Sequence, residues 1–204
     1  MGFYENKILP YVINKACGTP PIMKQRQKLV PQAEGRVLEI GMGSGLNIPL
    51  YDASKVELLW GLEPSPGMRE KARARVEAAN FPLEWLSLPG EEIPLDDNSA
   101  DTIVLTYTLC TIPDWLTAVQ QMRRVLKPGG RLLFSEHGKA PDEAIKKWQD
   151  RINPLWKKLA GGCHLNRDIP HLLEQGGFKV KEMDSMYLPS TPKIAGFTYW
   201  GYAA

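Results

Sequence analysis

The feature that most constrains this chain is the run VLEIGMGSG at residues 37–45. An apolar β-type stretch, residues 36–40, passes directly into a turn with three glycines, and we expect a helix to follow that turn. Because glycine has no Cβ, a ligand can lie directly against the backbone of such a turn. The run predicts the first strand of a wound α/β sheet, with a ligand site at the end of that strand.

Short apolar runs alternate with helical patterns along most of the remaining chain. Further strands are expected at residues 56–62, 83–88, 101–106 and 131–135. Helices are expected at residues 65–79, from Pro113, at 145–159 with a kink or a new start at Asn153-Pro154, and at 168–175. Residues 178–187 and 194–202 predict a terminal hairpin. This alternation is typical of a doubly wound, mostly parallel sheet.

Composition narrows the possible partners and compartments. The 204 residues carry a formal net charge of +2 with interspersed signs, which disfavours nucleic acid binding. Cys17, Cys110 and Cys163 form no CxxC pair, and the histidines have no metal-ligand spacing, so we expect no metal. No signal peptide or run of eighteen apolar residues is present, which favours a cytoplasmic protein. Peripheral membrane contact and oligomeric state stay open.

A carboxylate stands at the position expected for a nucleoside site. Glu63 lies 22 residues after Gly41, at the end of the second expected strand, where it can accept both ribose hydroxyls. A dinucleotide oxidoreductase uses GxGxxG, but Leu46 occupies the place of the third glycine and Gly45 comes one residue early. The spacing GxGxG favours a methyltransferase.

Two later segments complete a recognisable pattern. The run GEEIPLDDNSAD at 90–101 and the run VLKPGG at 125–130 follow the glycine turn and Glu63 in order. Over residues 37–136 the chain therefore resembles the class I S-adenosylmethionine-dependent methyltransferases. The resemblance implies a Rossmann-like methyltransferase fold with a seven-stranded sheet and a C-terminal antiparallel hairpin. Pro89 and Ala100 depart from the pattern, at positions where many relatives carry an acidic and an aromatic residue.

The resemblance also implies which residues surround the cofactor. The glycines would pack against its methionine and ribose parts, Glu63 would bind the ribose, and the main chain near residue 90 would contact adenine. The resemblance implies S-adenosylmethionine as the cofactor and S-adenosylhomocysteine as the product. The residues expected around them are Glu39, Gly41, Gly43, Gly45, Glu63, Pro64, Gly90, Glu91 and Thr106.

Four other segments resemble one branch of the family, the alkyl thiol methyltransferases. They are TLCTI at 108–112, FSEHG at 134–138, GGCHLNR at 161–167 and YWGYA at 199–203. The branch implies a small thiol or sulfide as methyl acceptor. Alternatives are N-methylation of phosphatidylethanolamine or another small molecule, and a cofactor-binding protein without catalysis.

Two residues are candidates for catalysis. His137 is the first choice for a general base, because imidazole titrates near the working pH and strand five ends on the cofactor side. Cys110 follows strand four and should lie near the methyl group. The structural alternatives are a packed histidine and a buried core cysteine.

The acceptor-side residues are expected to be Glu136, Cys163, His164, Asn166 and Arg167. Glu136 would hold His137 or a loop amide, and the alternative for the others is a glycine-rich turn pinned by Arg167.

One domain accounts for the whole chain, with three parts. Residues 1–35 form a helical lid or cover, with a helix opened by Pro20-Pro21 that runs through residue 32 and carries Arg26 and Lys28 on a polar side. Residues 36–136 form the cofactor-binding core. Residues 137–204 supply the acceptor-side helices and the hairpin. Trp148 and Trp156 lie on a helical stripe and are expected to pack in the core, with a substrate wall as the alternative.

Overall fold

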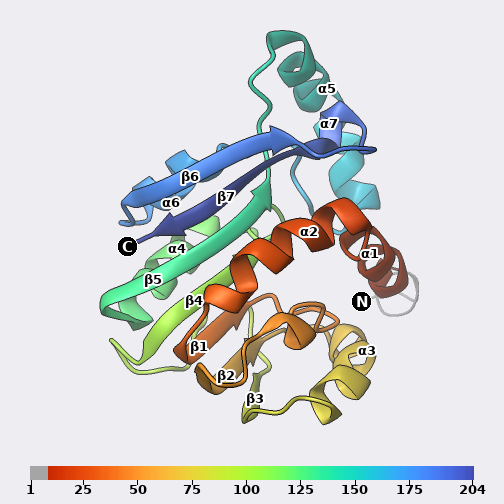
Figure 1. The fold of residues 1–204 in the computed structure, drawn as a ribbon. Coiled ribbons are helices and arrows are strands. Elements are labelled where there is room, and N and C mark those ends of the chain that lie inside the picture. Colours follow the sequence, from red (N-terminus) through yellow and green to blue (C-terminus); the bar gives the residue numbers. More distant parts are fainter. Residues whose placement is uncertain (1–8) are drawn as a thin grey trace.

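A seven-stranded sheet runs through the protein in the order β3-β2-β1-β4-β5-β7-β6 (Figure 1). The computed structural model describes residues 9–204. Pairing is parallel from β3 to β5, and β7 is antiparallel to both β5 and β6. The predicted doubly wound sheet with a terminal antiparallel hairpin is confirmed. The strands are β1 (Gly35–Ile40), β2 (Val56–Leu62), β3 (Leu83–Leu86), β4 (Ala100–Thr106), β5 (Leu126–His137), β6 (Val180–Tyr187) and β7 (Phe197–Ala203).

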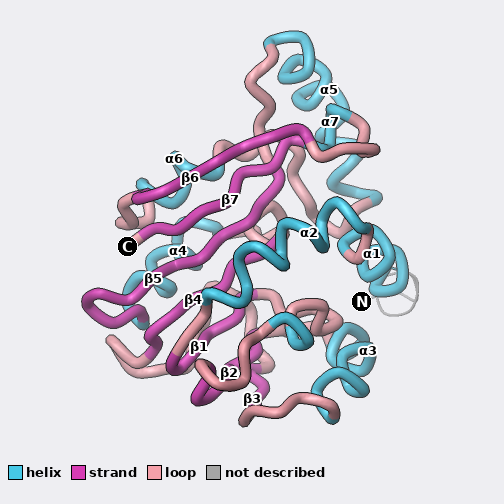
Figure 2. Tube along the Cα trace, in the orientation of Figure 1, coloured by secondary structure: helices cyan, strands magenta, loops and turns pink. Residues whose placement is uncertain are grey.

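Helices cover both faces of this sheet. On one face α2 contacts β5 and β7, whereas α4 packs on β5 and α6 on β6 behind the sheet (Figure 1). Figure 2 shows α5 and α7 close together beside one end of the β6–β7 hairpin. Among the described helices, none is both long and apolar enough to cross a bilayer. The helices are α1 (Leu9–Cys17), α2 (Pro20–Leu29), α3 (Pro66–Glu77), α4 (Trp115–Val125), α5 (Glu143–Leu159), α6 (Ile169–Gln175) and α7 (Lys193–Gly196), with 3-10 turns η2 (Val30–Gln32) and η3 (Ile48–Leu50).

Local sequence signals fix the starts of two of these helices. Ser65 precedes Pro66, and its hydroxyl accepts a hydrogen bond from the Met68 amide at 3.4 Å. Asp114 does the same for α4 through the Thr117 amide at 3.1 Å. Each cap satisfies a backbone N–H that the helix itself leaves unpaired.

The strands separate two apolar cores by the alternation of their side chains. Leu38 and Ile40 of β1 belong to the core on the α4 side. Val37 of the same strand belongs to the core on the other side, together with Leu29 at the end of α2. The central strands are therefore buried on both faces, as their nearly continuous apolar runs predict.

Three local expectations differ from the structure. The glycine turn leads into the short η3, not into an α-helix, because Gly41, Gly43 and Gly45 all adopt positive φ, which an α-helix does not allow. Of the two alternatives at Asn153-Pro154, a new helix start is wrong, since α5 continues through Pro154, and a kink there stays a prediction. Residues 194–196 belong to α7, so β7 begins only at Phe197.

Candidate active site

The carboxyl ends of β1, β2, β4 and β5 meet along one edge of the sheet. They present the glycine turn, Glu63, Tyr107 and His137. The strand order reverses at β1, which lies between β2 and β4. Ligands of open α/β sheets bind in the crevice at such a reversal.

The glycine turn exposes its backbone at one position and packs closely at another. At Gly41, with φ of 63°, an added Cβ would collide with the Thr108 side chain. At Gly43, with φ of 59°, a Cβ would meet only the Gly41 carbonyl oxygen at 3.8 Å. Gly41 thus allows the turn to pack against the segment after β4, and Gly43 leaves bare backbone beside open space.

Glu63 joins two turns at the end of β2. Its Oε2 accepts a hydrogen bond from the Gly43 amide at 3.0 Å, and its Oε1 accepts one from the Ser65 amide at 2.8 Å. Burial raises the pKa of this carboxyl group, against the opposing effect of the two amides. The carboxylate is therefore fixed at the edge of the glycine turn.

A cavity of about 220 Å³ lies between the glycine turn and α1. Its wall includes Gly41, Gly43, Glu63, Met68 and Thr106. Of the other residues expected around the cofactor, several stand outside the described lining. These are Glu39, Gly45 and Pro64, together with Gly90, which packs near Ile112, and Glu91, which accepts a hydrogen bond from the Asp114 amide at 3.2 Å.

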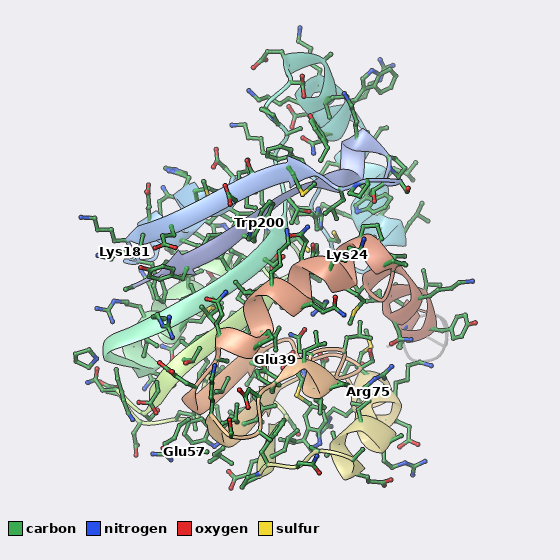
Figure 3. All side chains as sticks on the ribbon, viewed as in Figure 1. Lys24, Glu39, Glu57, Arg75, Lys181 and Trp200 are labelled. Atoms are coloured by element: carbon green, nitrogen blue, oxygen red, sulfur yellow. The ribbon has the colours of Figure 1, made fainter. Side chains whose placement is uncertain are left out.

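Glu39 lies beneath the glycine turn. Its two oxygens accept hydrogen bonds from Asn47 Nδ2 at 2.9 Å and from the Tyr51 hydroxyl at 2.7 Å. Burial raises the pKa of Glu39 to about 7. Figure 3 shows Glu39 between α2 and the sheet, whereas Glu57 and Lys181 project from the edges of the molecule. Glu39 therefore holds the two residues that flank η3, the segment that follows the glycine turn.

Arg26 reaches the cavity from α2. Its Nη1 donates hydrogen bonds to Asn47 Oδ1 at 2.8 Å and to Thr106 Oγ1 at 2.6 Å. Its guanidinium carbon lies 5.3 Å from the centre of the Tyr107 ring. The expected polar side of α2 faces inward at Arg26, because polar partners before η3 and on β4 bind its guanidinium in the interior. It is the only basic residue in the described wall of this cavity.

A second cavity, of about 810 Å³, adjoins the first. Both are lined by Ile13, Cys17, Tyr107 and Thr111. The rest of its wall comes mainly from the start of α2, from the end of α5 and from residues 189–192 and 195. Two separate ligands could therefore lie next to each other across Tyr107.

His137, Cys110 and Cys163 meet in the wall of this second cavity. His137 Nε2 lies 3.2 Å from Cys163 Sγ, and the two sulfur atoms are 3.5 Å apart. The His137 ring stacks on Tyr107 with 6.5 Å between centroids. The structure thus brings both expected catalytic residues and one expected acceptor-side residue together.

Burial and mutual contact shift the ionisation of this group. Burial alone would lower the pKa of His137, but the neighbouring Cys163 and Glu136 outweigh it and raise that pKa. The hydrogen bond with Cys110, together with burial, raises the pKa of the Cys163 thiol. The group therefore disfavours a free thiolate at Cys163.

The other acceptor-side residues support the loops around this group. Glu136 is fully buried, and its Oε1 accepts hydrogen bonds from the Thr108 amide at 2.7 Å and the Leu109 amide at 3.2 Å. Burial raises the pKa of Glu136. Arg167 donates to the Leu109 carbonyl and, at 2.8 Å, to the Ile112 carbonyl. The arrangement corresponds to the alternative in which Glu136 holds loop amides and Arg167 pins a turn.

His164 and Asn166 also stand outside the described cavity wall. The His164 amide donates to the Cys110 carbonyl at 2.9 Å, and burial lowers the pKa of its imidazole to about 4. Asn166 Nδ2 donates to Asp150 Oδ1 at 2.7 Å.

Several cavity residues escaped the sequence analysis. Tyr107 adopts a φ of 54°, and its position directly after β4 was the available signal. Cys17 reaches both cavities from α1. The two tryptophans of α5 were wrongly expected in the core: Trp156 lines the large cavity, and Trp148 is 53% exposed. The helix covers a cavity instead of the sheet, so its apolar positions have no core to fill.

Comparison with known proteins agrees with this geometry. A family model described as a methyltransferase domain matches residues 38–134. Thiol S-methyltransferase TMT1B of Homo sapiens is 34% identical over 177 residues, which cover 80% of this chain and 71% of the relative. Phosphatidylethanolamine N-methyltransferase of Cereibacter sphaeroides is 33% identical over 118 residues, which cover 55% of this chain and 57% of the relative.

A similar fold is found at lower sequence identity. A solved structure of a SAM-dependent methyltransferase from Leishmania major is similar with a TM-score of 0.71 at 18% identity, covering 98% of this chain and 80% of that chain. The Rossmann-like sheet, the glycine turn with its fixed carboxylate, and the relatives agree. The chain belongs to the S-adenosylmethionine-dependent methyltransferases, in the family of the thiol S-methyltransferase TMT1B.

Proposed function

We propose that this enzyme transfers the methyl group of S-adenosylmethionine to the sulfur of a small, apolar thiol or of sulfide. The observation that carries the proposal is the large cavity that adjoins the cofactor cavity and shares Tyr107 and Thr111 with it. The name of the human relative, thiol S-methyltransferase, supports the same acceptor class.

The residues of the smaller cavity fit the cofactor. Bare backbone at Gly43 lies beside open space, and the fixed Glu63 carboxylate is suited to the ribose hydroxyls. Arg26 places a buried positive charge where the cofactor's methionine carboxylate would need one. S-adenosylmethionine supplies a methyl group already activated on a sulfonium. The protein's part is to align the acceptor and to exclude water.

Gly90 and Glu91 retain their proposed role near adenine, although the described cavity does not reach them. Arg69 of α3 donates a hydrogen bond to Ser87 Oγ, across the region between Glu63 and Gly90. Adenine would lie there only after local rearrangement of this pair.

The chemistry of the larger cavity suits an apolar thiol. Its wall is mostly apolar, with Ile13, Ile22 and Trp156 among its members, and Lys24 is the only lysine or arginine in the described part. A small thiol is partly ionised near neutral pH, and its thiolate needs no strong general base. The phosphate of a phospholipid would need more positive charge than this wall provides. We assign the activity to the cytoplasm, where the three free cysteines would stay reduced.

An acceptor screen tests the proposal. The purified chain is incubated with methyl-labelled S-adenosylmethionine and sulfide, methanethiol, a mercaptoalkane or phosphatidylethanolamine vesicles, and both S-adenosylhomocysteine and labelled product are measured. We expect label in the thiol products. Label in phosphatidylethanolamine alone would replace the thiol assignment with N-methylation. Cofactor binding without S-adenosylhomocysteine formation from any acceptor would indicate a binding protein.

A further inference from the structure

Three metal-ligating side chains converge in the wall of the larger cavity from three separate segments. Cys110 follows β4, His137 ends β5, and Cys163 follows α5. The ligating atoms of the three lie within 4.8 Å of one another. Spacing along the chain does not predict this group, because its three residues lie far apart in the sequence. The spacing of the cysteines and histidines therefore predicts no metal.

We propose that Cys110, His137 and Cys163 bind a Zn²⁺ ion whose fourth position opens into the larger cavity. Two thiolates and an imidazole are a donor set that zinc prefers. A tetrahedral zinc with Zn–S of about 2.3 Å and Zn–N of about 2.0 Å separates two sulfurs by roughly 3.8 Å, and sulfur from nitrogen by roughly 3.5 Å. Cys163 Sγ lies 3.5 Å from Cys110 Sγ and 3.2 Å from His137 Nε2, each about 0.3 Å closer than this geometry requires. The ligating atoms of Cys110 and His137 lie within 4.8 Å of each other, so side-chain adjustments would bring the three residues around one ion.

The loops that carry the cysteines are held in place by groups outside the metal site. Glu136 receives the Thr108 and Leu109 amides just before Cys110. The His164 amide next to Cys163 donates to the Cys110 carbonyl at 2.9 Å, and so ties the two cysteine loops directly together. A site whose ligands are positioned before the ion arrives loses less entropy on binding it.

Three protein ligands and an open fourth position are the arrangement of catalytic zinc, whereas structural zinc takes four protein ligands. The open side faces the cavity that we assign to the acceptor, so this role rests on the proposed function. The acceptor thiol would release its proton to solvent and bind zinc as a thiolate. Its sulfur would then form a bond to the methyl carbon while the methyl–sulfonium bond breaks, with the electron pair left on S-adenosylhomocysteine. The neutral thioether is a weaker ligand and would leave.

The two cysteines could instead form a disulfide if an oxidant such as hydrogen peroxide removed two electrons and two protons. Their reduced state favours metal binding, and the presence of His137 in the same group is not explained by a disulfide. A disulfide in place of metal is therefore an outcome that overturns the proposal.

Metal content of the full chain tests the site without methyl donor or acceptor. The chain is purified without chelators and reconstituted with Zn²⁺ or, in a separate sample, with Co²⁺. Its metal content and absorption are compared with those of Cys163→Ser and His137→Gln. The control is His171→Gln, on the exposed side of α6. We expect one zinc per chain and the thiolate-to-cobalt absorption of a tetrahedral site. Both should be lost in the first two variants and kept in the third. Cofactor affinity by calorimetry should be unchanged in all three, which shows that each variant is folded.

The results separate this proposal from the proposed function. Any of three results overturns the zinc site, even if the acceptor screen shows methylated thiols. These results are no bound metal, equal metal content in all variants, and a disulfide between the two cysteines with no zinc uptake. Bound zinc together with label only in phosphatidylethanolamine overturns the thiol acceptor and its binding to zinc, while the metal site itself stands.

Discussion

The two cavities of this enzyme are built in different ways. Apart from α1, Arg26 and Met68 of α3, the wall of the smaller one comes from the ends of β1, β2 and β4 and the turns that follow them. The larger one combines the start of α2 with residues 137, 156, 163, 189–192 and 195. Cofactor recognition therefore depends on short continuous motifs, and acceptor recognition depends on how distant segments pack.

The chemistry of the two walls differs as well. The smaller cavity carries the fixed Glu63 carboxylate and the buried Arg26 guanidinium, which suit a polar cofactor. The larger cavity combines an apolar wall with two thiols and one imidazole. Substitutions at residues that line only one cavity should thus leave binding in the other nearly unchanged.

The largest effect is expected for Glu63→Ala. The change removes the carboxylate that would bind the ribose and that holds the Gly43 and Ser65 amides. Loss of the two charge-assisted hydrogen bonds that the carboxylate would make with the ribose hydroxyls should weaken S-adenosylmethionine binding by about 4 kcal/mol. This corresponds to roughly a thousandfold increase in the dissociation constant measured by calorimetry.

The matched control is Glu57→Ala, at an exposed position of the same strand, with affinity as in the unchanged protein. Gly43→Val should act in the same direction as Glu63→Ala, because valine is strained at the φ of 59° and would fill the space beside the turn. Unchanged affinity in both Glu63→Ala and Gly43→Val would show that the cofactor does not bind in this cavity.

A smaller effect, on stability, is expected for Glu39→Gln. Burial raises the pKa of Glu39 from 4.5 to about 7, so the folded state disfavours its ionised form. The contribution of Glu39 to the free energy of unfolding should therefore be fully present below pH 4.5, and should be lost as the pH rises through about 7. The glutamine variant lacks this fall and should be more stable than the unchanged protein by up to about 3 kcal/mol above neutral pH.

Urea unfolding at a series of pH values measures this difference. Glu57→Gln, at the exposed position of β2, serves as control and should follow the unchanged protein. Parallel curves for Glu39→Gln and the unchanged protein would show that Glu39 is ionised without penalty in the fold.

The smallest effect compares the two tryptophans of α5. Trp156→Ala removes apolar surface from the larger cavity and should raise the KM for a thiol about tenfold, equivalent to about 1.4 kcal/mol, without changing cofactor affinity. Trp148→Ala, at a half-exposed position, should change neither. Equal KM values for the two variants would place the acceptor elsewhere.

The fold could be predicted from sequence where the signal is local. The apolar run of β2 gives its bounds, residues 56–62, without error, and Ser65-Pro66 marks the start of α3. The helix expected after the glycine turn is absent, because hydrophobic periodicity does not reveal that Gly41, Gly43 and Gly45 all take positive φ. Such a turn uses residues that would otherwise form the first helical turn.

The site residues, too, could be predicted only where the signal is local. Glu63 stands where its distance from Gly41 placed it, because both belong to one β-turn-β unit. The inward position of Arg26 could not be predicted, since its partners Asn47 and Thr106 lie on other elements. Likewise, no spacing rule relates Cys110 to Cys163, which only the packing of α5 beside the β4 end brings together.

Helix α1 lies over both cavities. Asn14 Oδ1 accepts a hydrogen bond from the Ser44 hydroxyl of the glycine turn at 2.6 Å, and Ile13 and Cys17 on the same helix line both cavities. A rotation or departure of this one helix would change the entrance for the methyl donor and the room for its acceptor at the same moment. The same helix therefore contributes to the walls of both the donor cavity and the acceptor cavity.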